Sequence, residues 1–200
     1  DYTQYVNPFI GAADNGHTFP GATTPFGMIQ TSPVTGAVGW RYCSEYVYND
    51  SIIWGFTQTH LNGTGCMDLG DVLLMPSTGE RTRAWDGYRS RFSKDQESAT
   101  PGYYSVLLEE PNVKVELTAS PRVALHRYTY HNADSAAVLI DLQHAPAWNA
   151  GQYHSQVSIC DVQWEDAQTL SGHVRNSVWV HQDYFFVLKF NRPTTGQINL

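Results

Sequence analysis

From Ser51 onward, apolar and polar residues alternate with a period of two. The segment NVKVELTAS (112–120) places valines and a leucine on one face of an extended chain and lysine, glutamate and threonine on the other. This is the pattern of a strand with one buried face, and apolar residues nowhere recur at helical spacing over three turns. The pattern predicts an all-β fold, an antiparallel β-sandwich with long Gly/Pro-rich loops on one rim.

Further runs rich in β-branched and aromatic residues predict more strands, at 122–130, 135–142, 177–182 and 184–190. Turn residues at Ser171–His173 and His181–Asp183 predict breaks between strands. The first forty residues contain many Gly and Pro but few charges, and bulky apolar residues are interspersed among them. We therefore expect ordered coil wrapped on a core, with one short strand near Gly27–Thr31.

Composition excludes several classes of protein. The net charge is −7, charged residues make up 16%, and no lysine–arginine cluster is present, so binding to nucleic acid is not expected. No apolar run approaches the ~20 residues of a membrane span. The start, DYTQYVNPFIG, has neither a basic region nor an apolar core, so an export signal was either removed or never existed. Three cysteines without a CxxC pair do not match a zinc ribbon.

The loop THLNGTGCMDLGD (59–71) is long for a connection between two apolar, strand-like segments and contains three glycines. Glycine permits positive φ and close approach of backbone to a ligand or another strand. The loop has no Gly-Lys-Ser/Thr, which argues against a phosphate-binding loop, and the chain has no G-x-S-x-G nucleophile elbow. His60 and Cys66 supply two of the three or four ligands that zinc needs.

Asp68, Asp71 and Asn62 offer oxygens that calcium could use, without the spacing of an EF-hand loop. The two aspartates could also lie the roughly 5 to 10 Å apart that a glycosidic acid–base pair requires. Aspartates beside glycines at strand ends more often cap turns, and we favour this structural interpretation.

Aromatic residues make up 13% of the chain, with six Trp and twelve Tyr. Such rings suit sugar binding and a large β core equally well. Trp40, in the segment GWRYCSEY, lies beside Arg41 in a polar stretch without alternation. It could be a sugar platform or a core residue, and the local pattern leaves both open.

Several long strings carry a resemblance to a known family: VNPFIG, NGHTFPGATTPFGMIQTSP, GFTQTHLNGTGCMDLGDVLLMP, PGYYSV and ELTASPRVALHRYTY. Together they resemble the N-terminal domain of glycoside hydrolase family 92, bacterial exo-acting α-mannosidases. The resemblance extends from about Val6 to about Phe190.

The resemblance implies a supersandwich domain of the galactose-mutarotase type over residues 1–200, incomplete at its C-terminus. It implies a C-terminal (α/α)6 barrel of the same polypeptide, absent from this chain, with the active site between the two parts. The implied reaction is calcium-dependent, inverting hydrolysis of a terminal α-mannoside, of α-1,2 type, in N-glycan degradation. The general acid, the carboxylates that activate water and most calcium ligands are implied to lie in the barrel, so this chain alone is expected to be inactive. The implied location is secreted, periplasmic or on the outer surface of a bacterium.

By the same resemblance, the chain forms one wall of a mannose pocket, with no catalytic or metal-binding residue of its own. The expected substrate-binding residues are Trp40, Arg41, His17, Cys66 and Asp68. The expected loop and interface residues, which would meet the barrel, are Phe19, Gly21, Phe26, His60, Asn62, Gly63 and Gly65.

Two other functions compete with this interpretation. A stand-alone carbohydrate-binding module or lectin would bind mannosides without a second domain. A mutarotase-like epimerase would need a paired His and Glu on one sheet face, for which His126 and Glu116 on neighbouring predicted strands are the candidates.

Overall fold

The computed structural model describes residues 1–78, 87–131, 135–196 and 198. Its strands are β1 Ala22–Thr23, β2 Gln30–Val34, β3 Ile52–Ile53, β4 Gly55–Thr57, β5 Leu73–Thr78, β6 Ser90–Arg91, β7 Glu97–Thr100, β8 Tyr103–Leu108, β9 Val113–Ala119, β10 Ala124–Tyr130, β11 Ala136–Asp141, β12 Val157–Trp164, β13 Thr169–Ser177 and β14 His181–Lys189. Three short 3-10 turns accompany them: η1 Thr3–Tyr5, η2 Trp40–Tyr42 and η3 Lys94–Gln96. Within the described part no helix is long and apolar enough to cross a membrane.

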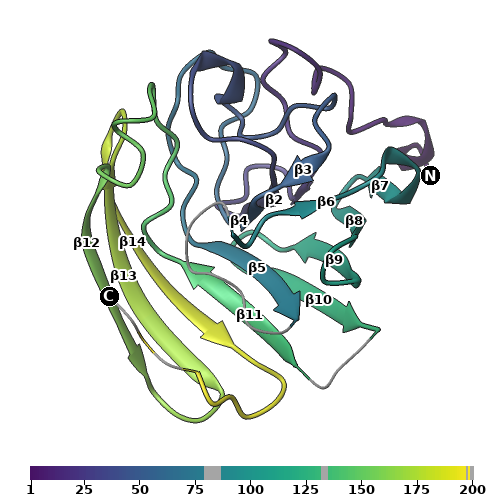
Figure 1. Ribbon diagram of the computed structural model, residues 1–200. Coiled ribbons are helices and arrows are strands. Elements are labelled where there is room, and N and C mark those ends of the chain that lie inside the picture. Colours follow the sequence, from purple (N-terminus) through teal and green to yellow (C-terminus); the bar gives the residue numbers. More distant parts are fainter. Residues whose placement is uncertain (79–86, 132–134, 197, 199–200) are drawn as a thin grey trace.

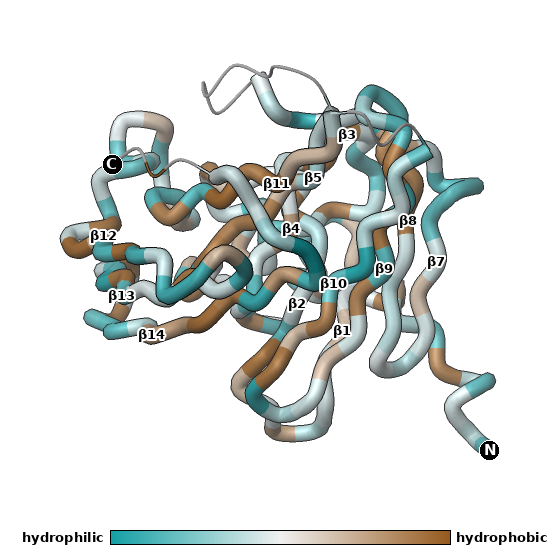
Figure 2. Tube along the Cα trace, turned by 90° about the horizontal axis from the view of Figure 1, so that it is seen from below, coloured by the Kyte–Doolittle hydropathy of each residue, from teal (hydrophilic) through white to brown (hydrophobic). Residues whose placement is uncertain are grey.

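Three antiparallel sheets lie in layers (Figures 1 and 2). The middle sheet has the order β1-β2-β4-β5-β11, and the sheet β10-β9-β8-β7 covers one of its faces. The sheet β12-β13-β14 packs on the other face, against β5 and β11, and β3 pairs with β6. The predicted all-β antiparallel sandwich is thereby confirmed, with a third layer that the alternation did not reveal.

Strand β5 is buried on both faces because it lies in the middle layer. Leu73 and Met75 join the core shared with β8 and β9, whereas Leu74 joins the core shared with Val174 of β13. A strand of this kind is a continuous apolar run rather than an alternating one, as VLLMP (72–76) is. Two separate cores therefore meet at a single strand.

The alternating segments 112–120 and 122–130 form the strands β9 and β10, but on β10 Val123 and Leu125 are exposed and His126 faces the core. Val113, Val115 and Leu117 are fully buried, and all seven residues of β10 pair with β9. The strand predicted near Gly27–Thr31 is displaced toward the C-terminus, because Gly27 lies in the turn before β2.

Two predicted turns are wrong. The segment Ser171–His173 lies inside β13, and His181–Asp183 is the start of β14, so the true turn is at 178–180. Gly172, which suggested a turn, lets β13 pack closely: a Cβ there would come within 2.4 Å of the Phe186 ring. Consequently the predicted strand at 177–182 is the end of one strand, a turn and the start of the next.

Because β5 is buried on both faces, shortening its side chains should lower the free energy of unfolding strongly. Leu73→Ala should lower the free energy of unfolding by about 2–5 kcal/mol, because Leu73 is fully buried and the cavity cannot collapse between two sheets. Leu125→Ala on β10 removes the same atoms from a side chain that is 65% exposed and should cost well under half as much. Urea denaturation of both variants measures the difference, and equal losses would contradict the layered core.

Candidate functional site

Three coil segments lie side by side at one edge of the sandwich, and we call them the rim: residues 37–47, 59–71 and 142–148. Val38 and Ala147 form an isolated parallel bridge, and the Gly39 N–H donates to the Ala147 carbonyl at 2.8 Å. The fold therefore brings the first and third segments together although about a hundred residues separate them. The turn between β13 and β14 adjoins the rim, since the Trp179 N–H donates to Asp68 Oδ1 at 3.3 Å.

Trp40 joins the first rim segment to the second. Its indole Nε1–H donates to the Gly65 carbonyl at 3.0 Å, while the side chain remains 49% exposed. A Cβ on Gly65 would lie 2.7 Å from Nε1, so the contact requires glycine. Because the polar edge of the ring is already bonded, the orientation of the exposed indole is fixed.

His17 lies against Trp40, with ring centroids 4.6 Å apart in an edge-on arrangement. The Gly63 N–H donates to the His17 carbonyl at 2.6 Å. The imidazole is buried, neither of its nitrogens has a hydrogen-bond partner among the described residues, and burial lowers its pKa. The structure thus gathers four of the predicted site residues, Trp40, His17, Gly63 and Gly65, at one place.

The other predicted substrate residues are placed differently. Arg41, in the first rim segment, is exposed and pairs at 3.7 Å with Asp50, which lies outside the rim. Cys66 follows Gly65 directly, and burial together with the Asp68 carboxylate raises the pKa of its thiol. A thiol with a raised pKa is a poor nucleophile and metal ligand at neutral pH.

The two loop aspartates hold the loop together. Asp68 accepts from the Trp179 backbone, and Asp71 accepts from the Thr59 hydroxyl at 2.7 Å and the Asn176 amide at 2.6 Å. Burial raises the pKa of Asp71. These oxygens bond to protein donors and do not fit a calcium site; in the described ranges no group of three or more His, Cys, Asp or Glu could hold a metal ion.

The predicted interface residues divide into two groups. Phe19 and His60 are buried, with tilted rings 5.0 Å apart, and Gly21 packs closely on β2, so these residues underlie the rim. Asn62 and Phe26 lie on the surface; Phe26 is fully exposed and has a φ of +57°, which is unusual for an aromatic residue.

Sequence reasoning missed the polar centre beneath the rim. Glu45 is 1% exposed, and its carboxylate lies between the imidazoles of His60 and His144. Two exposed tryptophans, Trp148 and Trp179, also went unrecognised. No local pattern could have indicated the polar centre, because His144 and Glu45 are 99 positions apart.

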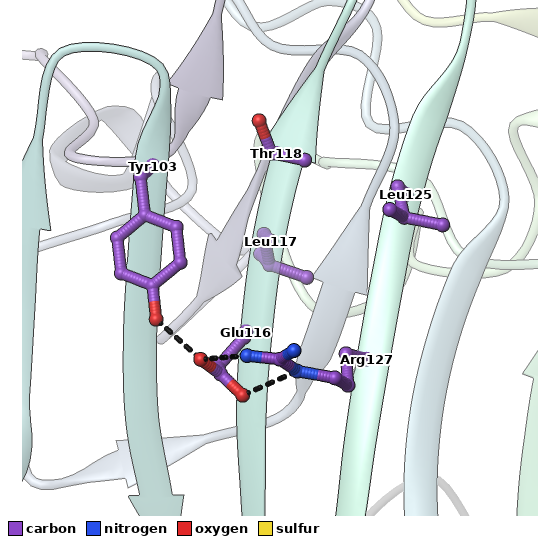
Figure 3. Close-up of a pocket in the computed structure, with 6 residues that line it drawn as sticks. All are labelled: Tyr103, Glu116, Leu117, Thr118, Leu125 and Arg127. Atoms are coloured by element: carbon purple, nitrogen blue, oxygen red, sulfur yellow. Dashed lines mark hydrogen bonds and ion pairs between the residues drawn. The ribbon is translucent and has the colours of Figure 1, made fainter.

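A shallow pocket of about 180 Å³ lies elsewhere, on the outer face of the β7–β10 sheet (Figure 3). Glu116 there accepts two 2.7 Å hydrogen bonds from Arg127 and one of 2.6 Å from Tyr103. His126 is on the opposite face, bonded to Gln58 and Tyr128, and burial lowers its pKa to about 4. His126 and Glu116 therefore cannot be the pair that the epimerase hypothesis requires, because they do not share a face.

Comparison with known proteins now assigns the family. A profile of the glycosyl hydrolase family 92 N-terminal domain matches residues 5–198, so the chain belongs to that family. It is similar to a solved family 92 α-mannosidase of Bacteroides thetaiotaomicron in complex with mannoimidazole: the TM-score is 0.86 and the identity 38%, over 97% of this chain and 26% of that one.

Two further relatives are more distant. An inverting family 92 mannosidase of Bacteroides thetaiotaomicron shares the fold, with a TM-score of 0.70 and 23% identity over 98% of this chain and 30% of that one. A protein of Arthroderma benhamiae named as an uncharacterized secreted glycosidase is 29% identical over 158 residues, 71% of this chain and 20% of its own length. The chain thus spans 20% to 30% of the length of these relatives.

Two glycines of the 59–71 loop should differ in how much their replacement by alanine lowers the free energy of unfolding. Gly70 has a φ of +82°, and a Cβ there would lie 2.7 Å from Pro146 and 2.9 Å from the Glu45 carboxylate. Gly63 has a φ of +71° but open space around it. Gly63→Ala should lower the free energy of unfolding by the backbone strain alone, about 1–2 kcal/mol. Gly70→Ala should lower it clearly more, because the added Cβ also clashes with Pro146 and Glu45. Thermal unfolding of the two variants tests this, and a smaller loss for Gly70→Ala would refute the close packing.

The Glu116 cluster predicts a contribution to acid stability. Its hydrogen bonds from Arg127 and Tyr103 lower the pKa of Glu116 to about 2 from the ordinary 4.5. A carboxyl with a depressed pKa stabilises the fold above about pH 4.5, and this contribution disappears as the pH falls toward 2. The difference in unfolding free energy between wild type and Glu116→Gln should therefore shrink from pH 6 to about pH 2. A difference independent of pH would show that the carboxylate charge contributes nothing.

Proposed function

We propose that this chain is the N-terminal domain of an exo-acting, inverting, calcium-dependent α-mannosidase that removes terminal α-1,2-linked mannose from N-glycans. Family membership and the 38% identity to a solved α-mannosidase over nearly the whole chain support the assignment. The observation that carries the role of this domain is Trp40, a half-exposed indole whose orientation is fixed by Gly65.

In this proposal the chain forms one wall of the mannose pocket and does not supply the acid and base that react with the substrate. The exposed face of Trp40 would pack on the apolar face of a sugar ring, and the close-packed loop beneath it would exclude water. Such positioning affects rate strongly, because a misplacement of about 1 Å can cost roughly a hundredfold. Asp68 and Asp71 accept hydrogen bonds from Trp179, Asn176 and Thr59, which supports a source of the acid and base outside this chain.

Calcium, when bound, would position and polarise sugar hydroxyls or water. The oxygens of the 59–71 loop do not fit that ion, so we place its ligands in the second domain of the proposed polypeptide, an (α/α)6 barrel.

Exposed apolar residues near the rim and at the β1–β2 turn support a surface that meets this second domain. Phe26 is fully exposed, and Trp179 and Trp148 are 68% and 40% exposed. Exposed apolar patches of this kind commonly mark interaction sites. The secreted glycosidase among the relatives supports action outside the cytoplasm.

Kinetics of the complete polypeptide test the proposal. It should hydrolyse terminal α-mannosides in a calcium-dependent manner, whereas the 200-residue chain should show no turnover. Trp40→Ala should lower kcat/KM by at least about tenfold, equivalent to ~1.4 kcal/mol, and Trp40→Phe by less because it keeps a ring.

Turnover by the 200-residue chain alone would refute the division of labour. Millimolar or tighter binding of mannobiose by this chain in calorimetry, together with an inactive complete polypeptide, would instead establish the lectin alternative.

A further inference from the structure

The carboxylate of Glu45 accepts hydrogen bonds from His144 and Thr57 and packs against His60. Oε1 lies 2.6 Å from His144 Nε2, while Oε2 accepts from the Thr57 hydroxyl at 3.1 Å and lies 3.5 Å from His60 Nε2. Glu45 is only 1% exposed and its φ is +59°, a strained conformation for a residue other than glycine. Strain and burial at one residue indicate that the surrounding structure holds it in place.

Both imidazoles around this carboxylate are oriented through their second nitrogen. His60 Nδ1 lies 2.8 Å from the Gln30 carbonyl, which can only accept, so Nδ1 carries a proton. His144 Nδ1 lies 2.8 Å from the Tyr153 hydroxyl. Such outer partners fix the ring orientation and the tautomer. Glu45 is thus surrounded by groups that cannot turn away freely.

The first two rim segments are joined by two contacts, one exposed and one buried. On the outside, the Trp40 indole bonds to Gly65. On the inside, Gly70 leaves the space that the Glu45 carboxylate occupies, since a Cβ there would come within 2.9 Å of both oxygens. Trp40 and Glu45 are five residues apart in the first segment, and Gly65 and Gly70, which they contact, are five residues apart in the second. Trp40 and Glu45 therefore hold the same stretch of the 59–71 loop. Movement of one contact changes the position of the other.

We propose that Glu45 is a positioning residue for sugar binding: held by His144 and Thr57 and packed against His60 and Gly70, it sets the distance between the Trp40 segment and the 59–71 loop. It is buried and acts through Trp40 rather than on the ligand. This inference rests on the proposed function and extends it to a residue below the surface. A buried carboxylate is costly unless fully bonded, and apolar replacements of buried charges are often at least as stable, which supports a role in fixing the arrangement.

The domain offers a matched control in Glu97. Its side chain is also buried, and it accepts from the hydroxyls of Tyr46 and Tyr104 and pairs with Lys94 at 2.9 Å. Glu97→Gln therefore removes a buried carboxylate that bonds to the Tyr46 hydroxyl, next in sequence to Glu45, while the bonds of Glu45 to His144 and Thr57 and of Trp40 to Gly65 are kept. Glu45→Gln keeps the shape, but its amide nitrogen is a donor, so the side chain can accept from His144 or from Thr57 and no longer from both.

The experiment compares wild type, Glu45→Gln and Glu97→Gln in the complete polypeptide. It measures kcat and KM on a terminal α-mannoside, the Tm, and hydrogen exchange of the Trp40 indole N–H after selective ¹⁵N-tryptophan labelling, assigned through Trp40→Phe. Glu45→Gln should lower kcat/KM at least tenfold, mainly through KM, and accelerate exchange at Trp40. It should also shift a downfield His144 imidazole proton upfield, because an amide oxygen accepts more weakly than the carboxylate that makes the short bond in the wild type. Glu97→Gln should lower the Tm while kcat/KM stays within twofold.

Two outcomes overturn the inference. In one, Glu45→Gln retains kcat/KM within twofold of wild type. In the other, both variants lose activity in proportion to their loss of Tm, which makes Glu45 a stability residue only. If the wild type lacks α-mannosidase activity, the proposed function fails, and the exchange rate of Trp40 decides the positioning role by itself: unchanged exchange in Glu45→Gln refutes it.

Discussion

The burial of β5 on both faces is the constraint on which the rest of the structure depends. One strand can present two apolar faces only if a layer covers each, so the β7–β10 sheet and the β12–β14 sheet are both required. The connections between these layers must then run over the edges of the middle sheet. One rim segment, 142–148, begins such a connection from β11 to β12, whereas 59–71 joins β4 to β5 within the middle sheet.

The rim is held by backbone contacts that only glycine permits, together with a buried polar centre. Gly65 and Gly70 let two coil segments approach more closely than any side chain would allow, and Trp40 and Glu45 fill the space above and below. A coil with its polar groups paired in this way is rigid without regular secondary structure. Such a rim suits the wall of a binding site that we propose, since the Gly65 bond sets the orientation of Trp40 without a ligand.

How far the sequence could predict the site depended on whether a contact was local. The 59–71 loop became a candidate because its glycines and polar residues are adjacent in the chain, whereas Trp40 was chosen through the family resemblance, since its local pattern left a core role equally open. Ser171–His173 was misjudged since Gly172 serves close packing against Phe186, and a glycine in a strand looks the same as a glycine in a turn. The epimerase pair failed for a similar reason: His126 and Glu116 lie on adjacent strands but on opposite faces.

The sequence by itself determined that the chain is an antiparallel all-β domain, because the period-two alternation leaves no other way to bury the apolar face. It also determined the family, through long strings of uncommon residue types in a fixed order. The tertiary structure alone decided that Glu45 meets His144, that Val38 bridges Ala147, and that His17 is enclosed beside Trp40. Alternation fixes the face on which a side chain lies, whereas the layers decide which distant segments come together at their edge.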